Sequence, residues 1–172
     1  MKFVPLEIEG AFGVAAEPVV DERGFFARTY CAQEFADHGL ASVFVQASVS
    51  YNRVAGTLRG MHYADPPERK LVRPTRGVIW DVLVDLRPAS PTYRRWVGVE
   101  LSAADHRSIY IPTGVAHGFQ TLADDTEVEY LIDRAFDATS GRGARWDDPA
   151  FGIRWPMAPT VMSERDRAWA AL

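Results

Sequence analysis

The chain has 172 residues, and its 19 Lys and Arg against 23 Asp and Glu give a net charge of −4. This length predicts a single domain over residues 1–172, and an acidic chain without a basic run is a poor candidate for a nucleic-acid binder. The one cysteine, Cys31, cannot form an intrachain disulfide, which favours a reducing compartment. We find neither a signal peptide nor an apolar run of about 18 residues, so we expect a cytoplasmic protein with no membrane partner.

Short strands separated by turn residues are predicted along most of the chain. A helix is expected first, over residues 32–38, ending at Gly39. A second helix is expected over 163–169, with Ser163 as its N-cap and Asp166 three residues later. Between them, strand patterns occur at 44–50, 78–86, 95–101, 108–111, 118–122 and 127–132. Many short strands with little helix indicate an all-β sandwich or barrel.

The stretch 78–86 is the clearest strand. Its alternate residues form one apolar face, while Asp81 and Asp85 share the other face with Ile79 and Leu83. We expect the apolar face to point outward and the mixed face to line an interior that could hold a polar ligand. The residues of the apolar face are Val78, Trp80, Val82, Val84 and Leu86.

A histidine and two cations lie close together in the sequence between residues 59 and 70. His62 shares a strand face with Gly60, and Arg59 points to the opposite face unless Gly60 forms a bulge. Lys70 follows after a short loop. The spacing leaves two interpretations open, a functional cluster or the solvated end of a surface strand.

His117 follows the turn Pro112-Thr113-Gly114. It is either a metal ligand or a buried histidine paired with a carboxylate such as Asp81. A metal site needs three or four converging ligands, and the residues at 60 and 64 are Gly and Ala, so no His-x-His pair contains His62. We therefore favour the interpretation without a metal. The two other histidines, at positions 38 and 106, are expected to be structural or exposed.

Seven motifs in fixed order resemble the dTDP-4-dehydrorhamnose 3,5-epimerase family over about residues 3–169. The resemblance implies a mainly β, cupin-type jelly-roll barrel (a double-stranded β-helix) that works as a homodimer, with no metal or organic cofactor, on nucleotide-linked 4-keto-6-deoxy sugars. The motifs are DERGFF at 21–26, LRGMHY at 58–63, KLVR at 70–73, DVLVDLR at 81–87, SPTY at 90–93, IPTGVAHGF at 111–119 and WDDPAFGIRWP at 146–156.

Epimerisation beside a ketone requires a base, an acid on the opposite face, and a donor for the enolate oxygen. By the resemblance, His62 is the base, Asp166 orients it, Lys70 steadies the enolate oxygen and Tyr130 is the opposite-face acid. Asp166 is alternatively only a helix cap, and Tyr130 only an aromatic of the barrel wall.

The resemblance also assigns binding and supporting residues. His117 and Asp81 become a buried pair that supports the site. Arginine suits phosphate because its planar fork makes paired hydrogen bonds. The diphosphate contacts are Arg23, contributed by the dimer partner, and Arg59, with Arg165 as a weaker candidate, while Phe26 and Gln46 lie near the nucleotide base and the sugar.

This chain departs from the family pattern near the expected base pocket. Arg28 stands where many members carry Glu, and Ala47-Ser48 where many carry Asp-Asn. Phe136 replaces a second family tyrosine, and the loop between His62 and Lys70 is about two residues shorter than usual. These differences bear on which nucleotide sugar is bound and on whether C3, C5 or both are epimerised.

The leading prediction is therefore an isomerase that epimerises C3 and/or C5 of such a sugar in deoxysugar precursor biosynthesis. A C3-only or C5-only epimerase and a ketoisomerase acting on a different nucleotide sugar are close alternatives. A metal-dependent cupin and a non-catalytic sugar-nucleotide binding module belong to other classes. The complete set of His62, Lys70, Tyr130 and Asp166 argues against the binding module.

Overall fold

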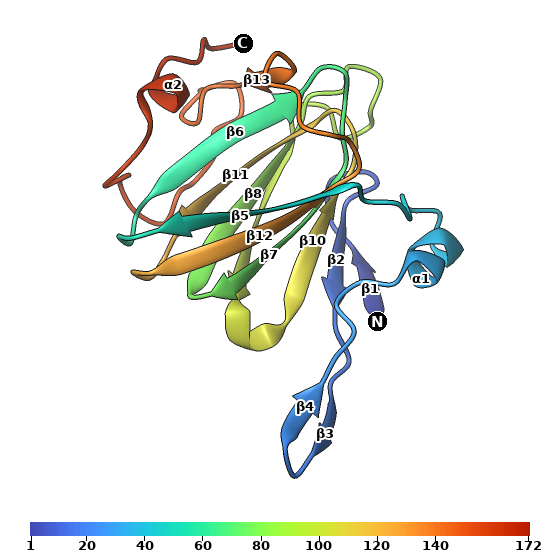
Figure 1. The fold of residues 1–172 in the computed structure, drawn as a ribbon. Helices are drawn as coiled ribbons and strands as arrows, with labels where there is room; N and C mark the ends of the chain where they lie inside the picture. Colours follow the sequence, from blue (N-terminus) through green and yellow to red (C-terminus); the bar gives the residue numbers. More distant parts are fainter.

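The computed structural model describes residues 1–172 as two antiparallel β-sheets that face each other (Figure 1). The six-stranded sheet consists, in spatial order, of β1 (Lys2–Pro5), β2 (Phe12–Ala15), β10 (Arg107–Ile111), β7 (Lys70–Arg76), β12 (Thr126–Ile132) and β5 (Gln46–Asn52). The five-stranded sheet consists of β13 (Gly141–Gly143), β6 (Leu58–Ala64), β11 (Val115–Thr121), β8 (Val78–Asp85) and β9 (Trp96–Ser102). The remaining elements are the hairpin β3 (Val19–Asp21) and β4 (Gly24–Phe26), with α1 (Ala32–Asp37), η1 (Ala103–Asp105) and α2 (Glu164–Arg167).

The main core lies between the two sheets, where apolar side chains of β8 and β11 meet those of β7, β10 and β12. Ile79 and Leu83 point into this core. Val82 and Val84 belong to a second core on the outer face of the five-stranded sheet, where Ala144 and other C-terminal residues cover them. The predicted division of strand 78–86 is thus confirmed, and its mixed face lines the barrel interior. The mainly β, jelly-roll fold is confirmed as well.

The longer predicted elements are present, with shifted ends. The strand predicted at 118–122 begins earlier, at Val115, because the preceding turn ends at Gly114, which has a φ of +74°. The first helix ends at Asp37, one residue early, and Gly39 adopts a φ of +69° as a helix-ending glycine. The second helix is a single turn that ends at Arg167, two residues before its predicted end. No helix is long and apolar enough to cross a membrane.

The turn after β8 is anchored by Asp85, whose side chain is fully buried. The carboxylate accepts hydrogen bonds from Arg87 Nε at 2.8 Å, Ser90 Oγ at 2.5 Å and Thr92 Oγ1 at 2.6 Å. Burial alone would raise the pKa of Asp85, but these hydrogen bonds outweigh it and hold the pKa far below its usual value. Asp85 is therefore ionised in the folded protein at every ordinary pH.

Replacing Asp85 with Asn is expected to lower the free energy of unfolding at pH 7 by about 3 kcal/mol, because it breaks a buried ion pair. The native contribution is fully present above the unfolded-state pKa of about 3.9 and is lost as pH falls toward the lower folded-state pKa. Urea denaturation at pH 7 and at pH 3 measures the difference. The control is Asp105→Asn, which breaks the half-exposed pair with Arg107 and should change stability by less than about 1 kcal/mol. Equal effects of the two substitutions would contradict this account of the turn.

Candidate active site

A bulge in β6 places His62 and Arg59 on the same wall of the barrel. His117 pairs with His62 and Phe119 with Arg59, so β6 uses one more residue than β11 over this stretch. Gly60 has a φ of +143°, and a Cβ atom there would lie 2.5 Å from Cα of Gly118. Only glycine fits this position. Gly60 thus forms the bulge that lets Arg59 share a face with His62, and the side chains of Arg59 and His62 line one cavity.

His62 is hydrogen-bonded to a carboxylate 104 residues further along the chain. Its Nε2 lies 2.7 Å from Oδ1 of Asp166, whose side chain is only 6% exposed. The other carboxylate oxygen accepts the N–H of Gly60 at 3.3 Å. The cap of α2 is Ser163, whose Oγ accepts the Asp166 N–H at 3.1 Å. Both oxygens of the Asp166 carboxylate therefore bind groups of β6, and the interpretation of Asp166 as only a helix cap is wrong.

Asp166 is held in its charged form. Burial alone would raise the pKa of Asp166, but the hydrogen bond and charge of His62, with the N–H of Gly60, outweigh burial and bring the pKa below its usual value. An ionised Asp166 that accepts the Nε2 proton of His62 leaves Nδ1 of the ring as the free base.

A second histidine–carboxylate pair lies beside the first. His117 Nε2 is 2.7 Å from Oδ1 of Asp81, and both side chains are almost completely buried. The ring of His117 packs edge-on against Tyr130, with centroids 6.3 Å apart. The structure thus brings the predicted supporting pair together. No three His, Cys, Asp or Glu side chains form a group that could hold a metal ion.

Tyr130 lies on β12, in the sheet that faces β6 (Figure 1). Its hydroxyl is 3.2 Å from Ser50 Oγ. Burial raises the pKa of Tyr130 to about 12, against smaller opposing effects of Ser50 and Arg59. The hydroxyl is therefore protonated near neutral pH, as an acid must be before it donates. Tyr130, His62 and His117 line a cavity of about 300 Å³ between the sheets, which also contains Arg59, Lys70, Gln46, Ser48, Ser50, Phe119, Ile132 and Phe136.

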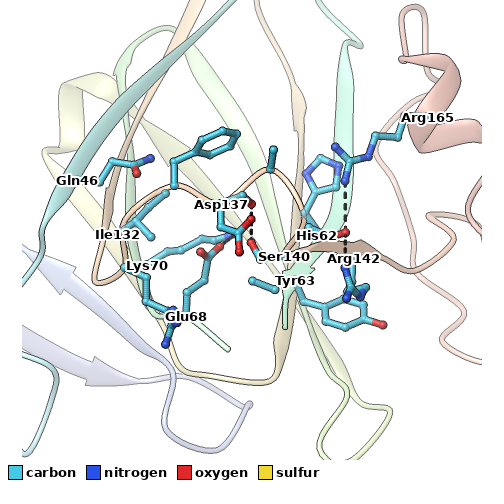
Figure 2. A pocket seen from close by; sticks show the side chains of 15 residues that line it. Gln46, His62, Tyr63, Glu68, Lys70, Ile132, Asp137, Ser140, Arg142 and Arg165 are labelled. Carbon is cyan, nitrogen blue, oxygen red and sulfur yellow. Dashed lines mark hydrogen bonds and ion pairs between the residues drawn. The ribbon is translucent and has the colours of Figure 1, made fainter. Parts of the chain in front are cut away.

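A second cavity of about 340 Å³ adjoins the first. Figure 2 shows His62 and Arg165 on one side of it, and Gln46, Ile132 and Lys70 on the other. Lys70 Nζ lies 3.0 Å from the Glu68 carboxylate, and Gln46 Nε2 donates to Ser48 Oγ at 3.1 Å. Five residues line both cavities, which makes them two parts of one cleft: Gln46, His62, Lys70, Ile132 and Phe136.

Several lining residues were not predicted. Ser50 follows Gln46 and Ser48 at period two on a predicted strand, so alternation alone could have placed it in the cleft. Glu68 precedes Lys70 by two residues, in a loop where sequence carries no directional signal. Arg134 and Arg142 lie on either side of a loop. The one sequence signal for them is that each is a cation without an obvious acidic partner in the sequence. All of these residues line the cleft.

Three predicted binding residues lie elsewhere in the chain. Arg23 forms a surface ion pair with Asp21 at 2.5 Å, and Arg28 forms one with Glu34 at 2.9 Å. Phe26 is 75% exposed. All three belong to or follow the β3–β4 hairpin, which projects away from the barrel (Figure 1). Within one chain, the structure does not bring these residues to the cleft.

The cleft presents a histidine supported by a carboxylate on one sheet and a protonated tyrosine on the facing sheet. A barrel with this arrangement can exchange protons on both faces of a carbon acid held between the sheets. Fold and site together define the class of epimerases built on a jelly-roll barrel.

Comparison with known proteins gives the family. The family model described as dTDP-4-dehydrorhamnose 3,5-epimerase matches residues 5–172, and the chain belongs to this family of isomerases. A curated relative of that name from Methanothermobacter thermautotrophicus is 41% identical over 175 residues, covering 99% of this chain and 94% of its own length.

Solved structures agree over nearly the whole chain. The Bacillus anthracis dTDP-4-dehydrorhamnose 3,5-epimerase with TDP and PPi bound has a TM-score of 0.95 and 38% identity, covering 99% of both chains. The Legionella pneumophila dTDP-6-deoxy-D-glucose-3,5-epimerase in complex with dTDP-4-keto-L-rhamnose has a TM-score of 0.93 and 33% identity, covering 99% of this chain and 92% of that one.

Proposed function

We propose that this protein epimerises C3 and C5 of a nucleotide-linked 4-keto-6-deoxy sugar of the dTDP-4-dehydro-6-deoxyglucose type, in deoxysugar precursor biosynthesis. The observation that carries the proposal is the His62–Asp166 pair facing Tyr130 across one cleft. The substrates named for the relatives support the choice of sugar. A cytoplasmic location completes the proposal, supported by the presence of a single cysteine.

The C–H bonds at C3 and C5 are acidified because both carbons are adjacent to the C4 carbonyl. Nδ1 of His62 takes the proton from one face, and the electron pair moves into the enolate. Lys70 donates to the enolate oxygen, since one of its three N–H groups serves Glu68 and the others remain free. Tyr130 then returns a proton to the opposite face, and solvent reprotonates Tyr130 and deprotonates His62.

The test is incubation with dTDP-4-keto-6-deoxyglucose in deuterated water. Nuclear magnetic resonance should show deuterium at C3, C5 or both, with inverted configuration. A product with a moved carbonyl would indicate a ketoisomerase, and tight binding without exchange would indicate a binding module. Absence of exchange with this and related nucleotide 4-keto sugars would overturn the proposal.

A single-position epimerase is the second candidate. Phe136 lines both parts of the cleft and is 80% exposed, and it lacks the hydroxyl of the tyrosine expected at that position. If that hydroxyl serves only one of the two carbons, deuterium will enter the other carbon alone. The position of the label in the same experiment distinguishes the two candidates.

We further propose that the working unit is a homodimer in which the hairpin of one copy completes the cleft of the other. The hairpin exposes Val19, Val20, Phe25 and Phe26, each more than half exposed. Val19 pairs with Phe26 and Val20 with Phe25, so each face of the hairpin carries one exposed apolar pair, and exposed apolar surface of this kind marks an interaction site. A second copy would bury it and would bring Arg23, Phe26 and Arg28 to a substrate.

Phe26→Asp is expected to convert the dimer to a monomer at micromolar concentration, because it places a charge in an apolar interface. The KM for the nucleotide sugar should rise by about 10-fold or more, because a monomer lacks the arginine contact that the hairpin of the second copy supplies. One lost charge-assisted contact costs about 1.5–3 kcal/mol. Light scattering coupled to gel filtration measures the mass. The control is Met157→Asp, at an exposed apolar position outside the hairpin. A native protein that is monomeric yet fully active would contradict the dimer.

A further inference from the structure

The side chains of Arg165, in α2, and Trp169, just after it, pack on two glycines of β13. A Cβ atom at Gly141 would lie 2.7 Å from Nη2 of Arg165, and one at Gly143 would lie 2.0 Å from Cε2 of Trp169. The side chains of Arg165 and Trp169 therefore occupy the space that side chains at 141 and 143 would fill. Arg165 Nη2 also donates to the Gly141 carbonyl at 3.4 Å, and its guanidinium lies 5.2 Å from the Trp169 ring.

The residues on both sides of this contact also contact His62. Gly143 pairs with His62 in the sheet, while Asp166, on the same helical turn as Arg165, hydrogen-bonds to the His62 ring. α2 is only four residues long, so propensity alone cannot hold it in place. What fixes Asp166 against His62 is the docking of the residues around it.

Trp169 also acts on the carboxylate itself. Its indole Nε1 is buried and makes no hydrogen bond, and its N–H is the smallest of the influences that lower the pKa of Asp166, after His62 and the Gly60 N–H. A buried N–H that is left without another acceptor favours the charged form of a nearby carboxylate. The tryptophan thus packs on Gly143, the sheet partner of His62, and adds polarity that favours the charged form of Asp166.

We propose that Trp169 is a positioning residue that, seated on Gly143, holds Asp166 against His62 and so keeps the base oriented. Trp169 is not expected to touch the substrate. It acts through Asp166, and its effect on the rate rests on the proposed function, whereas its effect on Asp166 does not.

The first experiment is a carbon-detected NMR titration of the Asp166 carboxyl, which needs no substrate. In Trp169→Ala the pKa of Asp166 should move up toward the ordinary value, because the indole is lost and the contact with His62 loosens. In Trp169→Phe the ring still fills the seat but the N–H is absent, so the shift should be smaller. An unchanged titration in Trp169→Ala would overturn the proposal.

The second experiment is kinetic. Trp169→Ala should lower kcat by roughly 10- to 100-fold, the cost of a misplaced catalytic group, with a smaller change in KM, and Trp169→Phe should restore most of the rate. Gly143→Ala should mimic Trp169→Ala, since the new methyl group displaces the ring. The double variant should be no worse than either single one, because both remove the same contact.

Trp155→Ala is the matched control. Trp155 is a half-buried tryptophan of the outer core whose Nε1 donates to the Trp146 carbonyl at 3.0 Å. Its loss should lower the melting temperature without moving the Asp166 titration. If Trp169→Ala lowers stability alone, as Trp155→Ala does, then Trp169 is only a packing residue and the proposal is wrong. A native protein without exchange activity, but with the Asp166 shift in Trp169→Ala, would refute the proposed function and leave this inference standing.

Discussion

His62→Ala is expected to lower the rates of epimerisation and of deuterium exchange by about 10²- to 10⁴-fold, the usual contribution of a positioned general base. The ring offers Nδ1 to the substrate because Nε2 is engaged at 2.7 Å by Asp166. The other histidine of the cavity of about 300 Å³, His117, cannot replace it, because its Nε2 is hydrogen-bonded to Asp81. Exchange measured at saturating substrate separates this loss from weaker binding.

The control for this prediction is a histidine outside the cleft. His38 lies at the end of α1 and donates from Nδ1 to the Glu34 carbonyl at 2.8 Å. His38→Ala should retain the native exchange rate. Exchange at the native rate in His62→Ala would remove it as the base, and the proton path would need another acceptor.

Sequence patterns predicted most of the strands that alternate. They missed the short ones and also β7, a seven-residue strand that contains Pro74. The strand predicted at 78–86 ends one residue earlier, at Asp85, and the face of Asp81 was assigned correctly because a long run at period two leaves little ambiguity. The hairpin strands β3 and β4 have three residues each, which is too few to show a period. The strand β13 is Gly-Arg-Gly, a composition that favours a turn.

The candidate site was predictable where the residues are local, and only by family resemblance where they are not. The bulge that aligns Arg59 with His62 was foreseeable as a condition on Gly60. The pairing of His62 with Asp166 joins positions 104 residues apart, and no periodicity carries that information. Trp169 was assigned to a helix that ends two residues earlier, so its contact with Gly143 could not be anticipated.

Net charge proved a poor guide to the ligand for a physical reason. The cavity of about 340 Å³ is lined by four cations and by the carboxylates of Glu68 and Asp137; the cations are Lys70, Arg134, Arg142 and Arg165. Fields act over about a Debye length of 8–10 Å in physiological salt. A local excess of cations can therefore attract a diphosphate to a chain whose total charge is −4.

Tyr130→Phe is expected to separate proton removal from inversion. His62 and its partner Asp166 remain intact, so deuterium should still enter the sugar, but from the face of the base and with retained configuration. Formation of the inverted product should fall by about 10²- to 10⁴-fold. The substitution removes only a hydroxyl that contacts Ser50, so the barrel wall keeps its packing. Product stereochemistry by NMR, compared with total exchange by mass spectrometry, gives both rates.

The pH dependence of the native enzyme tests the same assignment from another direction. The hydroxyl must be protonated to donate, and burial raises the pKa of Tyr130 to about 12. Ionisation of Tyr130 should therefore limit the rate only as pH approaches that value, well above the ordinary range for tyrosine.

Tyr51→Phe is the control for Tyr130→Phe, because Tyr51 bonds to Asp125 on the outer face of β5. If Tyr130→Phe inverts the sugar at the native rate, the proton on the second face comes from elsewhere, and water entering through the open cleft is the remaining donor.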